Sequence, residues 1–376
     1  MIYKTIEELT TVVTGGTPST SKAEYWENGN IPWLPSGCCQ NCDVNQADKF
    51  ISQSGYDNSS TQVMPVNTVM IALTGATAGK VGYLNIEACG NQSITGIFPC
   101  EELNPRFLFY FLISQRRKIL VDCIGGAQAH ISQGYVKKIK VPVYSKSIQE
   151  RIVNIMNICS KNIKHYEMIL KEYDELVKAR FIEMFGDPVA DTKNWGQTLL
   201  KEHLESIKYG TSTPPIFTDD GYAFIRATNI KNGKIVNNDM KYIPQEEADR
   251  LEKCKLSGGE IIIVRSGVNA GDTCVVTDEY IGQYAGYDMI LVLSSDLHPV
   301  FFNTLINTEY MDKVVKPLTR RAAQPHLNSE QTQRLPIIEV PFELQEQFAD
   351  FVKQVDKSRL DIKKSITEIE REVVYD

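Results

Sequence analysis

Residues 73–84, with the sequence LTGATAGKVGYL, carry the residue types of a phosphate-binding loop: two glycines followed by a lysine. Such a loop requires four residues between its glycines and, after the lysine, a Ser or Thr whose hydroxyl binds Mg²⁺. Here only three residues separate Gly75 from Gly79, and Val81 follows Lys80. We therefore expect a turn between two strands, where glycine provides positive φ or close backbone approach, and no nucleotide site.

The cysteines form the second candidate for chemistry. Cys39 and Cys42 have the C-x-x-C spacing of zinc ligands, but a structural zinc site needs a second pair of Cys or His. Cys89 and Cys100 are poorly spaced for that role, so we expect no metal site. The N-terminus lacks the basic-then-apolar order of a signal peptide, which predicts reduced thiols in a cytoplasmic protein. No apolar run approaches the length of a membrane span.

Two histidines lie in similar polar segments, His130 in GGAQAHISQ and His326 in RRAAQPHLNS. Each follows a segment with helical periodicity. One interpretation is a turn that caps the next helix. The other is a loop whose Gln, His and Arg side chains donate hydrogen bonds to phosphates or base edges of a nucleic acid.

The chain lacks the patterns of several enzyme classes. It has no G-x-S-x-G sequence around a serine nucleophile. It also has no Asn- or Asp-Pro-Pro-aromatic stretch, no glycine-rich opening for S-adenosylmethionine and no clustered nuclease carboxylates. We therefore expect no active centre, and no bound cofactor, in this chain.

The glycine-bounded hairpin occurs twice. Residues 69–84, VMIALTGATAGKVGYL, match residues 260–276, EIIIVRSGVNAGDTCVV, at an offset of 192 positions (75 to 267). Both glycines are kept, but Asp272 replaces Lys80. An acidic side chain there would repel a triphosphate, which is a second argument against a phosphate loop.

Later segments repeat as well, at an offset of 196 positions (147 to 343). His130 matches His326, and SIQERIVNIM at 147–156 matches ELQEQFADFV at 343–352. A period of about 195 residues indicates two tandem domains of the same kind rather than a solenoid. Short β-type runs such as TVMIAL and MILVL, separated by Gly and Asn and accompanied by helical patterns, make each domain mixed α/β.

Each domain is followed by apolar residues at heptad spacing, which predicts a long helix. The expected seam residues are Ile152, Ile155, Tyr166, Ile169, Tyr173, Phe348, Phe351, Val355, Ile362 and Ile369. Such a stripe cannot bury itself on a lone helix, so we expect the two helices to pack on each other as an antiparallel coiled coil. The predicted class is α+β, with domains at 1–146 and 188–342 and helices at 147–187 and 343–376.

The formal net charge of the chain is −7. A non-specific nucleic-acid binder usually carries a basic surplus, so the acidic balance weakens a DNA-binding interpretation. It leaves room for local basic faces such as SQRRKIL and KPLTRRA.

The duplicated architecture resembles the DNA-specificity (S) subunit of type I restriction-modification systems. The resemblance rests on the two hairpins, the FIRATNI segment, the HISQGYVKKIKVPVYSKSIQERIV and HLNSEQTQRLPIIEVPFELQEQF junctions, and the ARFIEMFGDP helix exit. The second helical region has no match to ARFIEMFGDP.

The resemblance implies a function in phage defence, in a bacterium or an archaeon. Each globular domain would be a target-recognition domain that reads one half of a bipartite double-stranded DNA sequence, and the coiled coil would set the unread gap. The helices would dock two copies of a modification subunit, which binds S-adenosylmethionine and methylates adenine. A restriction subunit can join such a complex.

An asymmetric target needs two readers with the same frame and different contact residues. The candidates for DNA contact in the first domain are Lys80, Gln128 and His130. Those in the second domain are Arg226, Arg265, Asn269, Arg320, Arg321, Gln324 and His326. The acidic charge of the chain suggests that partner subunits supply much of the grip on DNA.

Two other classes of function stay open at this point. One is a stand-alone enzyme that hydrolyses nucleotides or modifies nucleic acids. The other is a scaffold whose paired domains bind proteins.

Overall fold

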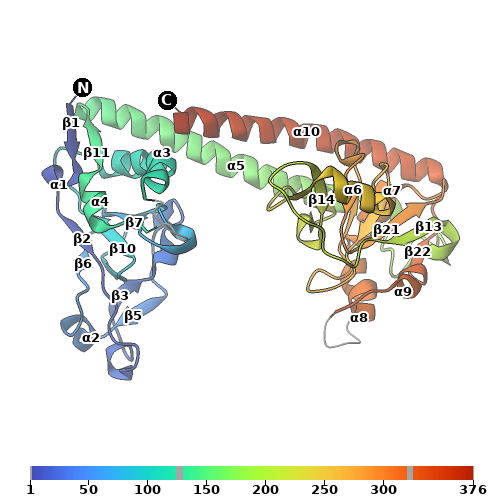
Figure 1. Ribbon diagram of the computed structural model, residues 1–376, viewed down its shortest axis with the longest axis horizontal. Helices are drawn as coiled ribbons and strands as arrows, with labels where there is room; N and C mark the ends of the chain where they lie inside the picture. The colour runs from blue at the N-terminus through green and yellow to red at the C-terminus, as the bar shows by residue number, and fades with distance from the viewer. Residues whose placement is uncertain (1, 124–129, 320–324, 376) are drawn as a thin grey trace. The chain divides into compact units, whose positions relative to one another are not determined.

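The computed structural model describes residues 2–123, 130–319 and 325–375. By its internal contacts the chain divides into a first unit, residues 1–167 with 364–376, and a second unit, residues 168–363. Two long helices belong to both units: α5 (Lys146–Phe185) begins in the first and ends in the second, and α10 (Phe342–Tyr375) begins in the second and ends in the first (Figure 1).

The first unit contains two mixed sheets and one strand pair. The larger sheet has the order β2 (Val12–Thr14), β10 (Ile94–Ile97), β7 (Val69–Ala72), β8 (Val81–Leu84) and β4 (Cys42–Val44). The smaller has the order β5 (Lys49–Ile51), β3 (Ile31–Leu34), β9 (Ala88–Gly90) and β6 (Val63–Met64). Strand β1 (Ile2–Thr5) pairs with β11 (Lys140–Val143), which leads into α5.

Helix α3 (Pro105–Cys123) covers β7 and β8 in the first unit. Its apolar face buries Phe109 and Leu112 against the strand residues Ile71 and Val81. The other helices of this unit are short: α1 (Ile6–Leu9), α2 (Gln53–Asp57), α4 (Gln133–Lys138), and the 3₁₀ turns η1 (Ala23–Tyr25), η2 (Ser36–Cys38) and η3 (Gly75–Thr77).

The second unit repeats this arrangement. Its main sheet has the order β13 (Leu204–Tyr209), β21 (Met289–Leu293), β18 (Ile261–Ile263) and β19 (Thr273–Val275). A smaller sheet has the order β17 (Lys241–Ile243), β14 (Tyr222–Ile225) and β20 (Tyr284–Ala285). Two pairs complete the strands: β12 (Gln197–Leu199) with β22 (Pro336–Ile338), and β15 (Ile230–Lys231) with β16 (Lys234–Ile235).

Apart from α5 and α10, the α-helices described in the second unit are shorter than α3. They are α6 (Gln245–Arg250), α7 (Pro299–Ile306), α8 (Lys316–Thr319) and α9 (Ser329–Gln333). The π-helix η8 (Met311–Val315) precedes α8, and the 3₁₀ turns are η4 (Leu200–His203), η5 (Ala227–Asn229), η6 (Glu252–Cys254) and η7 (Asp278–Tyr280). Helix α7 packs on β19. The predicted α+β class, with two similar mixed domains, is confirmed.

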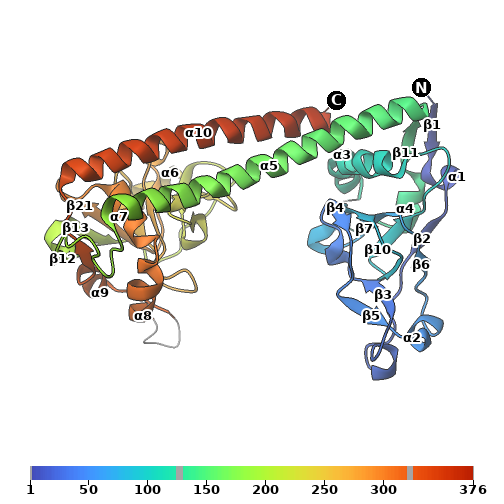
Figure 2. The same cartoon turned by 180° about the vertical axis from the view of Figure 1, so that it is seen from behind.

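Within the second unit the two long helices pack on each other in opposite directions (Figure 1, Figure 2). The ring of Phe348 near the start of α10 lies 5.5 Å from the ring of Phe181 near the end of α5. Further along, the guanidinium of Arg359 lies 2.6 Å from the carboxylate of Asp174. The antiparallel pairing of the helices follows from the order of these contacts.

The burial of the predicted seam residues is uneven. Phe348 and Val355 are buried. The half-buried residues are Ile152, Tyr166, Ile169, Tyr173, Phe351, Ile362 and Ile369. The prediction for Ile155 is wrong, since its side chain is 58% exposed. At this end of α5, Val153 and Ile152 pack against the core of the first unit, which turns the face with Ile155 to solvent.

Candidate nucleic-acid interface

The loop between β18 and β19 is closed by backbone hydrogen bonds. They run from Val264 N to Asp272 O (2.8 Å), Gly271 N to Val264 O (2.8 Å), Ala270 N to Gly267 O (3.0 Å) and Asp272 N to Asn269 O (2.9 Å). Gly267 and Gly271 have φ of 93° and 99°, in the region that side chains other than glycine rarely adopt. The glycines therefore shape the turn.

The segment around His326 is joined to this loop by backbone hydrogen bonds. Leu327 N donates to Arg265 O (2.9 Å), and Gly267 N donates to Pro325 O (3.1 Å). The Oγ of Ser266 and the Nδ1 of His326 are 2.9 Å apart. His326, which is distant in sequence from Arg265 and Asn269, is thus hydrogen-bonded to the loop that carries these two predicted contact residues.

Arg265 contacts two residues that the sequence analysis did not identify. Its backbone N donates to the Oδ1 of Asp288 (2.9 Å), and its guanidinium lies 4.9 Å from the ring centre of Tyr209. Burial raises the pKa of Asp288, while the hydrogen bond and the charge of Arg265 act in the opposite direction. Stacking on an aromatic ring is a usual way to orient an arginine.

Arg226 does not join this group through any hydrogen bond among the described residues. It follows β14 and donates to the carbonyl (2.6 Å) and the carboxylate (3.0 Å) of Asp239. The hydrogen bond from Arg226 lowers the pKa of Asp239, and Lys241 adds to the effect. The side chain of Arg226 thus already has a local anionic partner.

The loop between β7 and β8 in the first unit has the same bonding pattern. The matching bonds run from Ala72 N to Lys80 O (2.9 Å), Gly79 N to Ala72 O (2.8 Å), Ala78 N to Gly75 O (3.0 Å), Lys80 N to Thr77 O (2.8 Å) and Ile131 N to Leu73 O (2.9 Å). Gly75 and Gly79 have φ of 73° and 72°. The predicted glycine-bounded turn between two strands is confirmed.

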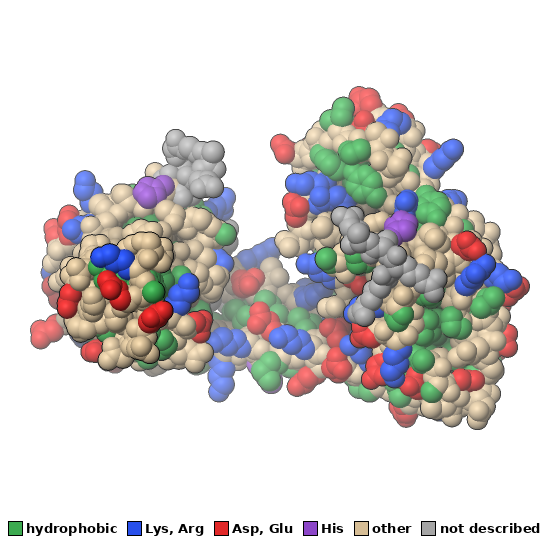
Figure 3. All heavy atoms as spheres, turned by 90° about the horizontal axis from the view of Figure 1, so that it is seen from below, with side chains coloured by type: hydrophobic (Ala, Val, Ile, Leu, Met, Phe, Trp, Pro, Cys, Tyr) green, Lys and Arg blue, Asp and Glu red, His purple; other side chains and the backbone are tan. Residues whose placement is uncertain are grey.

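Two predicted residues of the first unit lie at or beside this loop. The Nζ of Lys80 donates to the Oε1 of Gln40 (2.7 Å). His130 is exposed and directly precedes Ile131, which is bonded to Leu73. Figure 3 shows a histidine side chain at the surface of each unit. The predicted residues Gln128, Arg320, Arg321 and Gln324 lie outside the described residues.

The visible surface of each unit carries no single broad basic field. Lys and Arg side chains are interspersed with Asp and Glu in Figure 3. This distribution agrees with the net charge of −7. Local groups of donors, rather than a continuous basic face, are therefore what these units offer to an anionic polymer.

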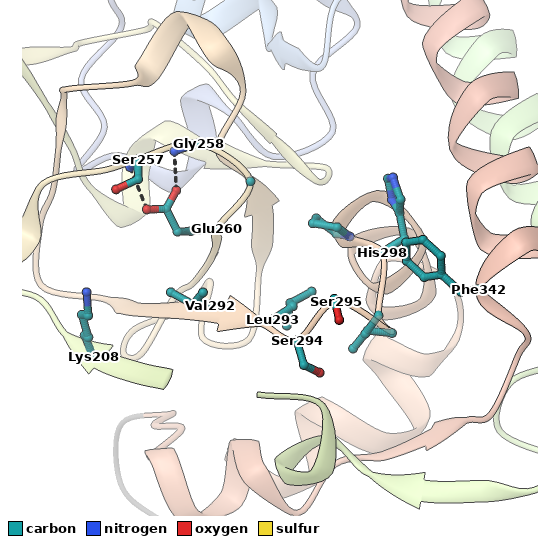
Figure 4. A pocket seen from close by; sticks show the side chains of 13 residues that line it. Lys208, Ser257, Gly258, Glu260, Val292, Leu293, Ser294, Ser295, His298 and Phe342 are labelled. Carbon is teal, nitrogen blue, oxygen red and sulfur yellow. Dashed lines mark hydrogen bonds between the residues drawn. The ribbon is translucent and has the colours of Figure 1, made fainter. Parts of the chain in front are cut away.

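A pocket of about 410 Å³ lies in the second unit, at the end of β18 opposite to the loop (Figure 4). Figure 4 shows Glu260 turned toward the backbone of Ser257 and Gly258, whose N–H groups it accepts at 2.7 and 2.6 Å. Burial lowers the pKa of His298, which also lines the pocket. The carboxylate in this pocket is engaged with backbone, so its role is structural.

The part of the chain that the structure describes contains no group of three or more His, Cys, Asp or Glu side chains that could hold a metal ion. Of the two cysteines with C-x-x-C spacing, Cys39 is buried and Cys42 is exposed. No helix in the described residues is long and apolar enough to span a bilayer.

A family model described as "Type I restriction modification DNA specificity domain" matches residues 2–172 and 194–371 of the chain. The specificity subunit of the type I restriction enzyme EcoR124I/EcoR124II of Escherichia coli is 29% identical over 160 residues, or 41% of this chain and 40% of that protein. The MjaIX specificity subunit of Methanocaldococcus jannaschii is 24% identical over 275 residues, or 71% of this chain and 52% of that protein. The chain thus spans about half or less of the length of these relatives.

Two solved structures share the fold. The S subunit of a type I restriction-modification system from M. genitalium has a TM-score of 0.51 at 15% identity, covering 99% of this chain and 93% of that chain. A chain from structural work on assembly and conformational transition of the type I R-M system has a TM-score of 0.61 at 14% identity, covering 99% of this chain and 95% of that chain. At these identities the likeness supports the fold.

Proposed function

The chain belongs to the family of type I restriction-modification DNA specificity domains, and from this membership we propose that it is the DNA-recognition subunit of a type I restriction-modification complex. The family that the sequence resembles is thereby confirmed. In the proposed function the chain performs no catalysis, and each globular unit reads one half of a bipartite target.

One observation carries the proposal. The β7–β8 loop and the β18–β19 loop share five backbone hydrogen bonds and both glycines, yet they carry different side chains at matching positions. The first loop ends in Lys80 and the second in Asp272. A conserved frame with exchanged side chains is what two readers of different sequences require, because phosphate contacts orient a protein and side chains at base edges discriminate.

The proposed partners follow from the family and from the duplicated helices. We expect two copies of a modification subunit to dock on α5 and α10, and S-adenosylmethionine to bind to those partners. A restriction subunit completes the complex in systems that cleave. The relatives come from Escherichia coli and Methanocaldococcus jannaschii, which supports a bacterial or archaeal source for the complex. A cytoplasmic location stays part of the proposal.

The entry into each helix supports equivalent docking surfaces. Gln149 and Gln345 occupy the same position of the repeat and are both buried. Gln149 donates to the carbonyls of Glu102 and Tyr144 and accepts from Asn104 N; Gln345 donates to those of Asp296 and Val340 and accepts from His298 N. The same junction between domain and helix is therefore built twice.

Selection from a random duplex library tests the proposal. The purified chain, alone and with its modification subunit, is expected to enrich a bipartite motif with a fixed gap, more strongly with the partner. Adenine methylation at that motif should disappear from the genome when this protein is removed. Turnover of ATP or methyl transfer by the chain alone would instead indicate a stand-alone enzyme. No enriched motif under either condition, with an unchanged methylome, would favour a protein-binding scaffold.

A further inference from the structure

Val268 at the tip of the second loop is an exposed apolar side chain. Its side chain is 96% exposed, the highest fraction among the described large hydrophobic residues. It stands between Gly267 and Asn269, beside the Ser266 hydroxyl that contacts His326. An isopropyl group therefore projects from a rim of polar groups.

The backbone that carries Val268 is fixed on both sides. Gly267 N is bonded to Pro325 O, and Ala270 N is bonded back to Gly267 O. A β-branched side chain also has few χ1 choices. Holding this side chain against a ligand thus costs little additional ordering entropy, which is the condition under which a small apolar contact adds affinity.

The side chains at the tip of the β18–β19 loop indicate which groups of DNA they could contact. Hydroxyl, amide and imidazole groups match the donors and acceptors of base edges, whereas an isopropyl group matches only an apolar feature. Among the four unmodified bases, thymine alone presents a methyl group in the major groove. We propose that Val268 is a specificity-determining residue that contacts the 5-methyl group of a thymine in the half-site read by the second unit. This inference rests on the proposed function.

The first unit offers a built-in contrast. Ala76 occupies the position of Val268 at the same offset of 192 (76 to 268) and is also exposed. Its single methyl group reaches less far from the backbone. The proposal is therefore made for Val268 of the second unit, whose side chain presents the larger apolar surface.

The test uses the chain assembled with its modification subunit and the duplex obtained by selection. Each thymine of the second half-site is replaced in turn by deoxyuridine, which removes only the 5-methyl group. At one position the replacement should weaken binding of the wild type by about fourfold, the value for one buried CH₂-sized group. Val268→Ala should weaken binding of the unmodified duplex by about fifteenfold, since two such groups are lost. The variant should be insensitive to deoxyuridine at that position.

Two variants and one library result make the test decisive. Ile281→Ala removes an apolar side chain of 50% exposure at the opposite end of the β18–β19 ribbon and should leave binding unchanged. Val268→Thr keeps the branched shape and should fall between wild type and Val268→Ala. Equal sensitivity of wild type and Val268→Ala to every deoxyuridine, or a second half-site without thymine, would overturn the inference. Failure to select any motif would overturn the proposed function instead.

Discussion

The loop between β7 and β8 and the loop between β18 and β19 share a backbone and differ in what supports it. Behind the first loop, the aliphatic part of Arg116 faces Gly79, and its Nε donates to Ala78 O (3.2 Å). Behind the second, the branched side chain of Val315 from η8 faces Gly271.

The anchoring of the two loops differs in the same way. Leu73 N donates to the carbonyl of Ser93 (2.8 Å), whereas the matching Arg265 N donates to the buried carboxylate of Asp288. Both loops thus have the same glycines and the same backbone hydrogen bonds, while the residues that pack against and anchor them differ. This difference is what a pair of recognition domains with different targets requires.

The largest expected effect is a difference in stability between glycine substitutions in the two loops. In Gly271→Ala, the new Cβ would lie 2.6 Å from Val315 Cγ1 at a φ of 99°, so strain and overpacking add to about 4 kcal/mol. In Gly79→Ala the Cβ would lie 3.2 Å from the flexible Arg116 Cγ, and we expect about 2 kcal/mol. Hydrogen exchange of β18–β19 and β7–β8 in the full chain measures both. Equal losses would contradict the proposed difference in support.

A second difference lies on the helices. Arg359 of α10 is buried and pairs with Asp174 and Asp356, whereas the matching position of α5 is Ile163 (163 to 359, offset 196). Arg359→Ala should destabilise the second unit by about 2 kcal/mol, less than for a fully buried pair, because both carboxylates are half-exposed and keep Lys234 as a partner. Hydrogen exchange along α10 is the measurement. The exposed Lys357→Ala on the same helix should change little.

The charge at the end of each loop gives the third prediction. Lys80→Ala should lower the affinity of the assembled complex for its selected duplex by about fivefold. It should also reduce the slope of log affinity against log salt concentration by about 0.9, the value for one phosphate contact. Titrations at several salt concentrations measure both. An unchanged salt slope would show that Lys80 serves only its hydrogen bond to Gln40. Lys253→Ala, exposed on η6 and outside the two long helices, is the charge-matched control.

The smallest expected effect concerns Asp272. Burial raises its pKa, and Lys316 partly opposes this. A carboxyl group with a raised pKa in the folded state binds more protons there than when unfolded, so the unfolding free energy falls as pH rises through the window between its ordinary and its raised pKa. Asp272→Asn should remove that decrease and make the second unit slightly more stable at pH 7, with no gain at pH 3. Urea unfolding at both pH values tests the sign.

Local sequence patterns predicted the parts of this molecule that depend on local physics. The glycines at 75, 79, 267 and 271 predicted the turns, because positive φ is a property of single residues. The heptad pattern predicted the long helices, but it misplaced Ile155. Which face of α5 is covered at that end depends on the globular core beside it.

The sequence did not reveal the intramolecular partners of the candidate contact residues. Arg226 pairs with Asp239. No sequence pattern indicates that Arg265 contacts the ring of Tyr209 and the carboxylate of Asp288. The exposure of Val268, from which the thymine contact is proposed, also cannot be recognised in the sequence.

By itself the sequence determined the duplication, the glycine-bounded hairpins and the amphipathic helices, since repeats, φ preferences and periodicity are carried by neighbouring residues. Only the tertiary structure decided that His326 joins the loop of Arg265 and Asn269, and that Gln149 and Gln345 are buried at the helix entries. Such contacts join residues that are distant in sequence. Their free energy comes from the burial and hydrogen bonding of the whole domain, which no short segment records.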